Sequence, residues 1–245
     1  MKTIISIDVH LRDMNKTRLI SMIAVFAALN VVFDAIIIPQ FSSGVWFGLV
    51  YLIIPITGIV LGPYAGFVST LMGVFVGHVV SPRGIEEFLF TFGAPLGAMI
   101  SGLLFQKKWK MVFIYYTVLL VSYFVTPISW QLPIWGMWDV FCAYLVLLIV
   151  IVFIRLKGNR INPLKNDMFL YGFCAFIGLE ADILFRIFIF IPGQTYQSIY
   201  GLPITALQSI WVAGALITPF KVAISIIITV LLGSRLASTY LRNDQ

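Results

Sequence analysis

Long apolar segments constrain the fold of this chain more than any other feature. A helix needs roughly 20 apolar residues to cross about 30 Å of hydrocarbon. Only 11% of the residues are charged and the mean hydropathy is +1.01, which excludes a water-soluble domain. Eight candidate spans follow, of which the second is short: 17–38, 46–61, 63–80, 88–105, 111–128, 137–155, 168–190 and 207–234.

These runs are uniformly apolar and lack the period-2 alternation of a membrane barrel. In lipid every backbone polar group must be satisfied within the protein, so helices are the remaining solution. We therefore expect an all-α, polytopic helical membrane protein with six to eight transmembrane helices, in one domain over residues 17–234. Residues 1–16 and 235–245 are expected to form tails on the cytoplasmic side.

The distribution of Lys and Arg sets the orientation, because short loops rich in these residues stay cytoplasmic. With eight spans, thirteen of the sixteen Lys and Arg residues fall on one side. Arg83 falls on the other side, and Arg186 and Lys221 lie within spans. Both termini should therefore be cytoplasmic, in a multi-pass protein of the cell membrane. This topology explains the net charge of +6, so the charge gives no support to nucleic-acid binding.

Five ionisable residues lie inside apolar segments. A charge at the bilayer centre costs roughly 2.5 to 3.5 kcal/mol, so such residues usually face the bundle interior and often mark a substrate or ion path. Asp182 and Arg186 are four residues apart on one helical face, which favours an ion pair and leaves substrate contact open. Glu180 is turned about 200° from Asp182 around the helix and needs a different partner.

Depth along the predicted helices suggests that partner. At about 1.5 Å per residue, Glu180 and Lys221 come to similar depths near the midplane. Consecutive helices are usually neighbours, so we predict that these two residues pair. Asp34 and Arg186 both fall in the outer half of their segments, where a second bridge or a shared ligand site is open.

Small residues recur at four-residue spacing in three segments, and such faces let helix backbones approach closely in lipid. Gly73 and Gly77 lie in the third segment and Gly97 in the fourth, where we expect packing within the chain. Ala24 and Ala28 lie in the first segment, which could equally present its Ala face to another membrane protein.

Metal sites and enzyme chemistry have little support in the sequence. Cys142 and Cys174 lie in different apolar segments without ligand spacing. His78, Glu86 and Glu87 make a weak metal signal, for which solvated loop residues are the commoner explanation. The chain has two His and no nucleophile motif or phosphate-binding loop. We therefore expect no metal, no cofactor and no enzymatic activity.

Three stretches resemble a known family. The basic-flanked first helix contains AVFAA at residues 24–28, residues 52–77 are LIIPITGIVLGPYAGFVSTLMGVFVG, and PFK at 219–221 opens the apolar body of the last segment. They are similar to the substrate-binding S components of energy-coupling factor (ECF) vitamin transporters. The resemblance covers residues 17–105 and 207–234, and residues 110–165 have no match in that pattern.

The resemblance implies a subunit that binds a vitamin or similar micronutrient from the outer side, within an ATP-driven importer. Its partners would be a membrane coupling subunit and two separate ATPases. Small residues of the first helix dock on the coupling subunit in that family, which assigns docking to Ala24 and Ala28. The ligand pocket would lie near the external loops, where the candidates are Trp46, His78, Glu86, Trp130, Trp135, Asp182 and Arg186.

Other functions remain open. A stand-alone ion-coupled transporter or a membrane sensor module would use Glu180 and Lys221. A retinal protein would carry its chromophore on Lys221 with Glu180 as the facing carboxylate, but it would have an odd number of spans, whereas the charges imply an even number. A membrane enzyme would need clustered His, Asp, Glu or Asn residues, which are sparse here.

Overall fold

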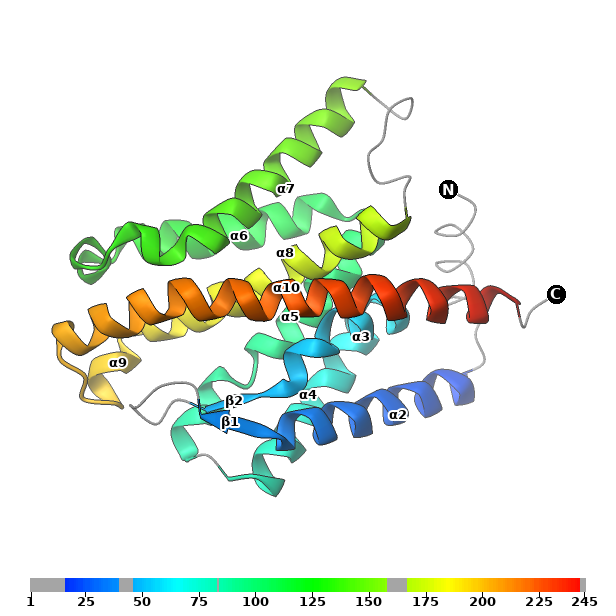
Figure 1. Ribbon diagram of the computed structural model, residues 1–245, viewed down its shortest axis with the longest axis horizontal. Coiled ribbons are helices and arrows are strands. Elements are labelled where there is room, and N and C mark those ends of the chain that lie inside the picture. Colours follow the sequence, from blue (N-terminus) through cyan, green and yellow to red (C-terminus); the bar gives the residue numbers. More distant parts are fainter. Residues whose placement is uncertain (1–15, 40–45, 83, 158–166, 243–245) are drawn as a thin grey trace.

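The computed structural model describes residues 16–39, 46–82, 84–157 and 167–242 and shows a polytopic helical membrane protein (Figure 1). Within these ranges five helical stretches are long and apolar enough to cross a membrane, and α6 is a shorter apolar helix. The main helices are α2 Lys16–Ala35, α3 Ile54–Leu61, α4 Pro63–Val80, α5 Gly93–Phe105, α6 Trp109–Val125, α7 Trp138–Lys157, α8 Asp167–Phe190, α9 Thr195–Ser198 and α10 Ile204–Arg242. Short 3₁₀ helices are η1 Leu49–Leu52, η2 Ile85–Phe90, η3 Pro127–Gln131 and η4 Ile134–Met137.

The long helices run roughly along one axis of the molecule (Figure 1). The start of α2, the end of α7, the start of α8 and the end of α10 lie at one end of the bundle, and α9 lies at the other. The first end is the one that the Lys and Arg distribution assigns to the cytoplasm. Helix α10 continues to Arg242, past the predicted boundary at residue 234.

The second predicted span, residues 46–61, is not a continuous helix. It consists of a short strand, β2 Trp46–Gly48, then η1 and the two-turn helix α3. Strand β2 pairs antiparallel with β1 Ile37–Pro39. Eight helical residues span only about 12 Å, too little to cross the hydrocarbon. Interrupted backbone at membrane depth is tolerated where protein covers it. Seven of the eight residues of α3 are buried.

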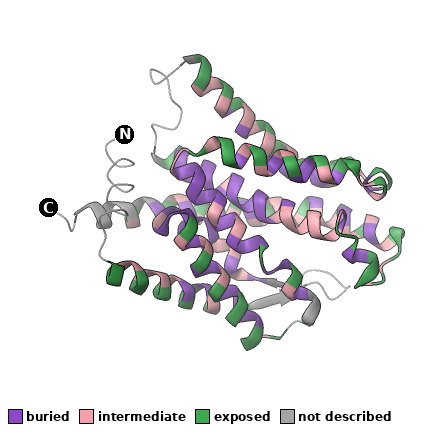
Figure 2. Ribbon diagram, turned by 180° about the vertical axis from the view of Figure 1, so that it is seen from behind, coloured by how far each residue is buried: buried purple, intermediate pink, exposed green. Residues whose placement is uncertain are grey.

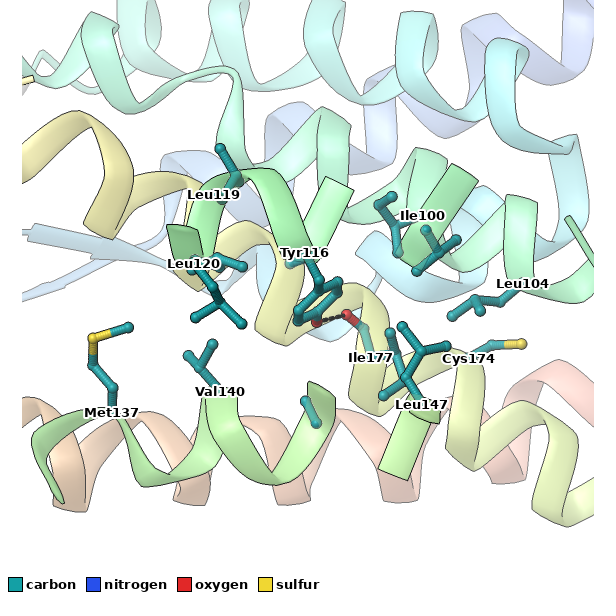
Figure 3. Close-up of a cluster of buried hydrophobic side chains, with 14 of the residues drawn as sticks. Ile100, Leu104, Tyr116, Leu119, Leu120, Met137, Val140, Leu147, Cys174 and Ile177 are labelled. Atoms are coloured by element: carbon teal, nitrogen blue, oxygen red, sulfur yellow. Dashed lines mark hydrogen bonds between the residues drawn. The ribbon is translucent and has the colours of Figure 1, made fainter. Parts of the chain in front are cut away.

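Helix α8 lies at the centre of the bundle and contacts α3, α5, α6, α7 and α10. Figure 2 shows the buried residues concentrated in the middle of the molecule, with exposed residues on the outer helices. The largest apolar cluster joins α5, α6, α7 and α8, as Figure 3 shows for Leu104, Tyr116, Leu147 and Ile177. The helix that carries Glu180 and Asp182 is therefore shielded on several sides.

Glycines form the closest helix contacts, as the small-residue spacing predicts for the third and fourth segments. A Cβ on Gly178 of α8 would collide with the Ser101 hydroxyl and lie 2.9 Å from the Gly97 carbonyl oxygen, both on α5. A Cβ on Gly73 of α4 would collide with Asn30 of α2. Both pairs of helices approach to backbone contact because these side chains are missing.

Helix α2 packs mainly on α4, at the rim of the bundle (Figure 1). Its buried residues are Ala27, Asn30 and Asp34, which follow one stripe of the helix. Ala24 and Ala28 lie outside this stripe and are exposed. The small-residue face of α2 is thus available to a partner, whereas its polar stripe faces the interior.

Candidate functional site

A buried carboxylate–histidine pair joins the outer ends of α2 and α4. The Asp34 carboxylate lies 3.2 Å from Nδ1 of His78, and both side chains are almost fully buried. Nδ1 is also 2.8 Å from the Val74 carbonyl oxygen. Both neighbours of this nitrogen are acceptors, so Nδ1 carries the hydrogen. A Cβ on Gly77 would lie 2.5 Å from the Asp34 carboxylate, so glycine is required at this contact.

The second pair is an ion pair between Asp182 and Arg186 within α8. Nε of Arg186 donates to Oδ1 of Asp182 at 2.7 Å, and Nη2 lies 3.5 Å from Oδ2. The pair predicted from the four-residue spacing is therefore confirmed. A Cβ on Gly93 would collide with Oδ1 of Asp182, which places this carboxylate against the first turn of α5. The positive end of that helix dipole favours the negative charge.

The two pairs belong to one group of interacting ionisable side chains. The charges of Asp34 and Glu87 act on Arg186 in addition to that of Asp182. Asp182 and Arg186 in turn act on Lys221. Glu87 is only 7% exposed and belongs to η2. We call this group the charged cluster: Asp34, His78, Glu87, Asp182, Arg186 and Lys221, from α2, α4, η2, α8 and α10.

The charged cluster offers both charge signs inside an apolar bundle. Charges interact far more strongly there than in water, because the effective dielectric constant is lower. Small-molecule sites are typically apolar with a few convergent polar groups. An anionic group of a ligand would meet Arg186 and Lys221, and a cationic or donor group would meet Asp34, Glu87 or Asp182.

The structure corrects the predicted pairing of Glu180 with Lys221. Both carboxylate oxygens of Glu180 are buried without a hydrogen-bond partner, and the charges that act on it are those of Asp139 and Asp182. Lys221 interacts with the Asp182 and Arg186 charges instead. The reason is geometric: Glu180 and Asp182 point to different sides of α8, and α10 brings Lys221 to the Asp182 side.

Two other predicted ligand residues, Trp130 and Trp135, are not brought to the charged cluster. Trp130 in η3 is 73% exposed and Trp135 in η4 is 54% exposed. The indole nitrogen of Trp130 donates to the Phe124 carbonyl at 2.9 Å. Exposed Trp rings suit an anchoring role at the membrane boundary. Trp46 lies in β2 and Glu86 in η2, and their side chains lie outside the described part of the structure.

The sequence places Glu87 only in a weak metal signal, leaves a shared ligand site open for Asp34, and predicts Glu180 as the partner of Lys221, whereas the structure brings all three residues to the charged cluster. Glu86 and Glu87 are adjacent, and sequence alone does not show which of two neighbouring acids turns inward. No group of three His, Cys, Asp or Glu residues that could hold a metal ion occurs among the described residues. Cys142 and Cys174 are free thiols.

Comparison with known proteins adds no family to this description. A scan against protein-family models and searches of curated proteins and of solved structures each returned no match. The geometry of the charged cluster and the exposed face of α2 therefore provide the evidence for a function.

Proposed function

We propose that this protein is the membrane-embedded binding subunit of an ATP-driven importer of the ECF type, and that its substrate is a vitamin or similar micronutrient. The observation that supports this most is the charged cluster. Six ionisable side chains from five elements converge within the bundle, and charges in a membrane interior are kept where a substrate or ion needs them.

The position of the charged cluster supports uptake from outside. Asp34 and His78 are in the last turns of α2 and α4, and Asp182 and Arg186 are in the second half of α8. Helices α2 and α8 start at the predicted cytoplasmic end of the bundle and run toward the end that carries α9, so these residues lie in the parts of the helices away from the cytoplasmic side (Figure 1). The sequence has no nucleotide-binding motif of its own, so ATP hydrolysis would require separate chains.

The exposed Ala24 and Ala28 supply a docking face for such chains. We expect the tagged protein, purified gently from the cells that make it, to retain two ATPases and a membrane coupling protein. The double variant Ala24→Leu/Ala28→Leu should lose them, because two isobutyl groups keep a partner helix from close approach. Both positions are exposed, so the variant should still fold.

A matched control keeps the side chains small at the same two positions. Ala24→Ser/Ala28→Ser preserves a small-residue face and should keep the ATPases. The measurement is quantitative mass spectrometry of the purified complexes, with size-exclusion chromatography to verify folding. A folded wild-type protein that never retains an ATPase would refute the importer proposal.

One observation favours a second candidate, an ion-coupled carrier that works alone. Glu180 is a fully buried acid near the middle of α8. Such acids serve as proton relays in transporters. Purified protein in liposomes would then accumulate substrate under an ion gradient without any ATPase, and the importer proposal predicts no accumulation under these conditions.

A further inference from the structure

The environment of Glu180 disfavours a negative charge. Its exposed fraction is 0%, and neither carboxylate oxygen has a hydrogen-bond partner. An ionised carboxylate buried without a donor costs far more than a neutral acid. Protonation removes this cost, because it neutralises the carboxylate without adding a heavy atom to the packed bundle.

Among the described residues, the charged groups that act on Glu180 are both acids. Asp139 of α7 and Asp182 of its own helix are the charged residues that act on it. Tyr116 of α6 lies close enough to interact with the Glu180 charge. Its hydroxyl, however, donates to the Ile177 carbonyl at 2.6 Å (Figure 3). Tyr115 likewise donates to the Ala181 carbonyl at 2.8 Å. Both phenol hydrogens are thus used by the α8 backbone.

Asp139 lies in a different environment, although it is only 3% exposed. Its carboxylate accepts hydrogen bonds from the Val140 amide at 2.9 Å and from the Thr218 hydroxyl of α10. It is also the acidic residue in the first turn of α7, where the helix dipole favours a negative charge. When two nearby carboxyl groups differ in this way, the one with donors keeps the charge and the one without them keeps the proton.

We propose that Glu180 and Asp139 form a proton-binding acid pair between α8 and α7, in which Glu180 holds the proton and Asp139 the negative charge. Glu180 faces another side of α8 than the charged cluster, because it points about 200° away from Asp182 around the helix. The proposal combines the burial of Glu180, the hydrogen bonds of Asp139 and the electrostatic interaction of the two acids across the α7–α8 contact, and it holds for the importer and for the carrier.

The acid pair links proton occupancy to helix packing. Loss of the proton would leave two like charges in the contact between α7 and α8, where water does not screen them. The bundle must then either admit water to Glu180 or separate the two helices. Proton release is therefore tied to a change at the α7–α8 contact.

Infrared difference spectroscopy tests the acid pair on the full chain in lipid nanodiscs. We expect the C=O stretching band of a protonated carboxylic acid at neutral pH, shifted in D₂O and absent in Glu180→Gln. Asp182→Asn, which removes the other acid near Glu180 on α8, should retain the band. In Asp139→Asn the band should disappear at a lower pH than in the wild-type protein, because Glu180 stays buried but the nearby Asp139 charge that disfavours its ionisation is gone.

Two outcomes would overturn the proposal. A neutral-pH spectrum in which Glu180→Gln removes no band means that Glu180 is ionised. A band whose titration is unchanged in Asp139→Asn means that Glu180 acts without its partner. If Glu180→Gln fails to fold, the acid band is instead identified in the wild-type protein labelled with ¹³C-glutamate. The chain has three Glu residues, and only a protonated one gives a labelled acid band.

Discussion

A leucine at Gly178 should prevent this protein from folding. A Cβ at this position already collides with the Ser101 hydroxyl, and the three further carbons of leucine have no space. The Ser101 hydroxyl cannot move freely, because it bonds the Gly97 carbonyl at 3.0 Å and the Cys174 carbonyl at 3.1 Å. Overpacking typically costs 1–3 kcal/mol, and we expect at least about 3 kcal/mol where two helix backbones touch.

The measurement is the yield of monodisperse protein in detergent, together with its thermal unfolding temperature. The control is Gly214→Leu on α10, where a Cβ would have no heavy atom within 4 Å. This variant should give wild-type yield. If Gly178→Leu matches Gly214→Leu in both measurements, the close contact between α5 and α8 is wrong.

Local sequence rules predicted the features that depend on one helix. The spacing of Asp182 and Arg186 predicted their ion pair, because residues four apart share a face of any α-helix. The 200° turn from Asp182 correctly separated Glu180 from that pair. The small-residue spacing predicted tight packing of α4 and α5, and Gly73 and Gly97 both lie at such contacts.

Features that depend on which helices meet could not be predicted in this way. Depth alone pairs Glu180 with Lys221, but the rotation of α8 and α10 about their axes decides which side chains face each other. The same limit hid Asp139 as the neighbour of Glu180, since it lies at a helix start in another segment. Residues 46–61 are as apolar as a spanning helix, and only their burial shows why an interrupted backbone is tolerated there.

Removing Arg186 should be the most damaging single change within the charged cluster. Arg186→Ala leaves the buried Asp182 carboxylate without its donor, and breaking a buried pair by removing one partner costs about 3–5 kcal/mol. The Arg186 side chain is 29% exposed, so we expect the lower end of that range. The measurement is thermal unfolding in detergent, with Arg155→Ala at an exposed position as the control.

The double variant Asp182→Asn/Arg186→Gln separates a structural role from a ligand role. Both new side chains are neutral, Asn has the shape of Asp, and Gln is polar but shorter than Arg. Neither member of the pair is then left as an unpaired charge, so stability should recover most of what Arg186→Ala loses. If the charged cluster binds the substrate, this stable double variant should not take up the substrate in cells, because the substrate has lost its ionic partners. Stability and uptake that recover together would show that Asp182 and Arg186 only hold α8 in place, and the ligand site would have to lie elsewhere in the bundle.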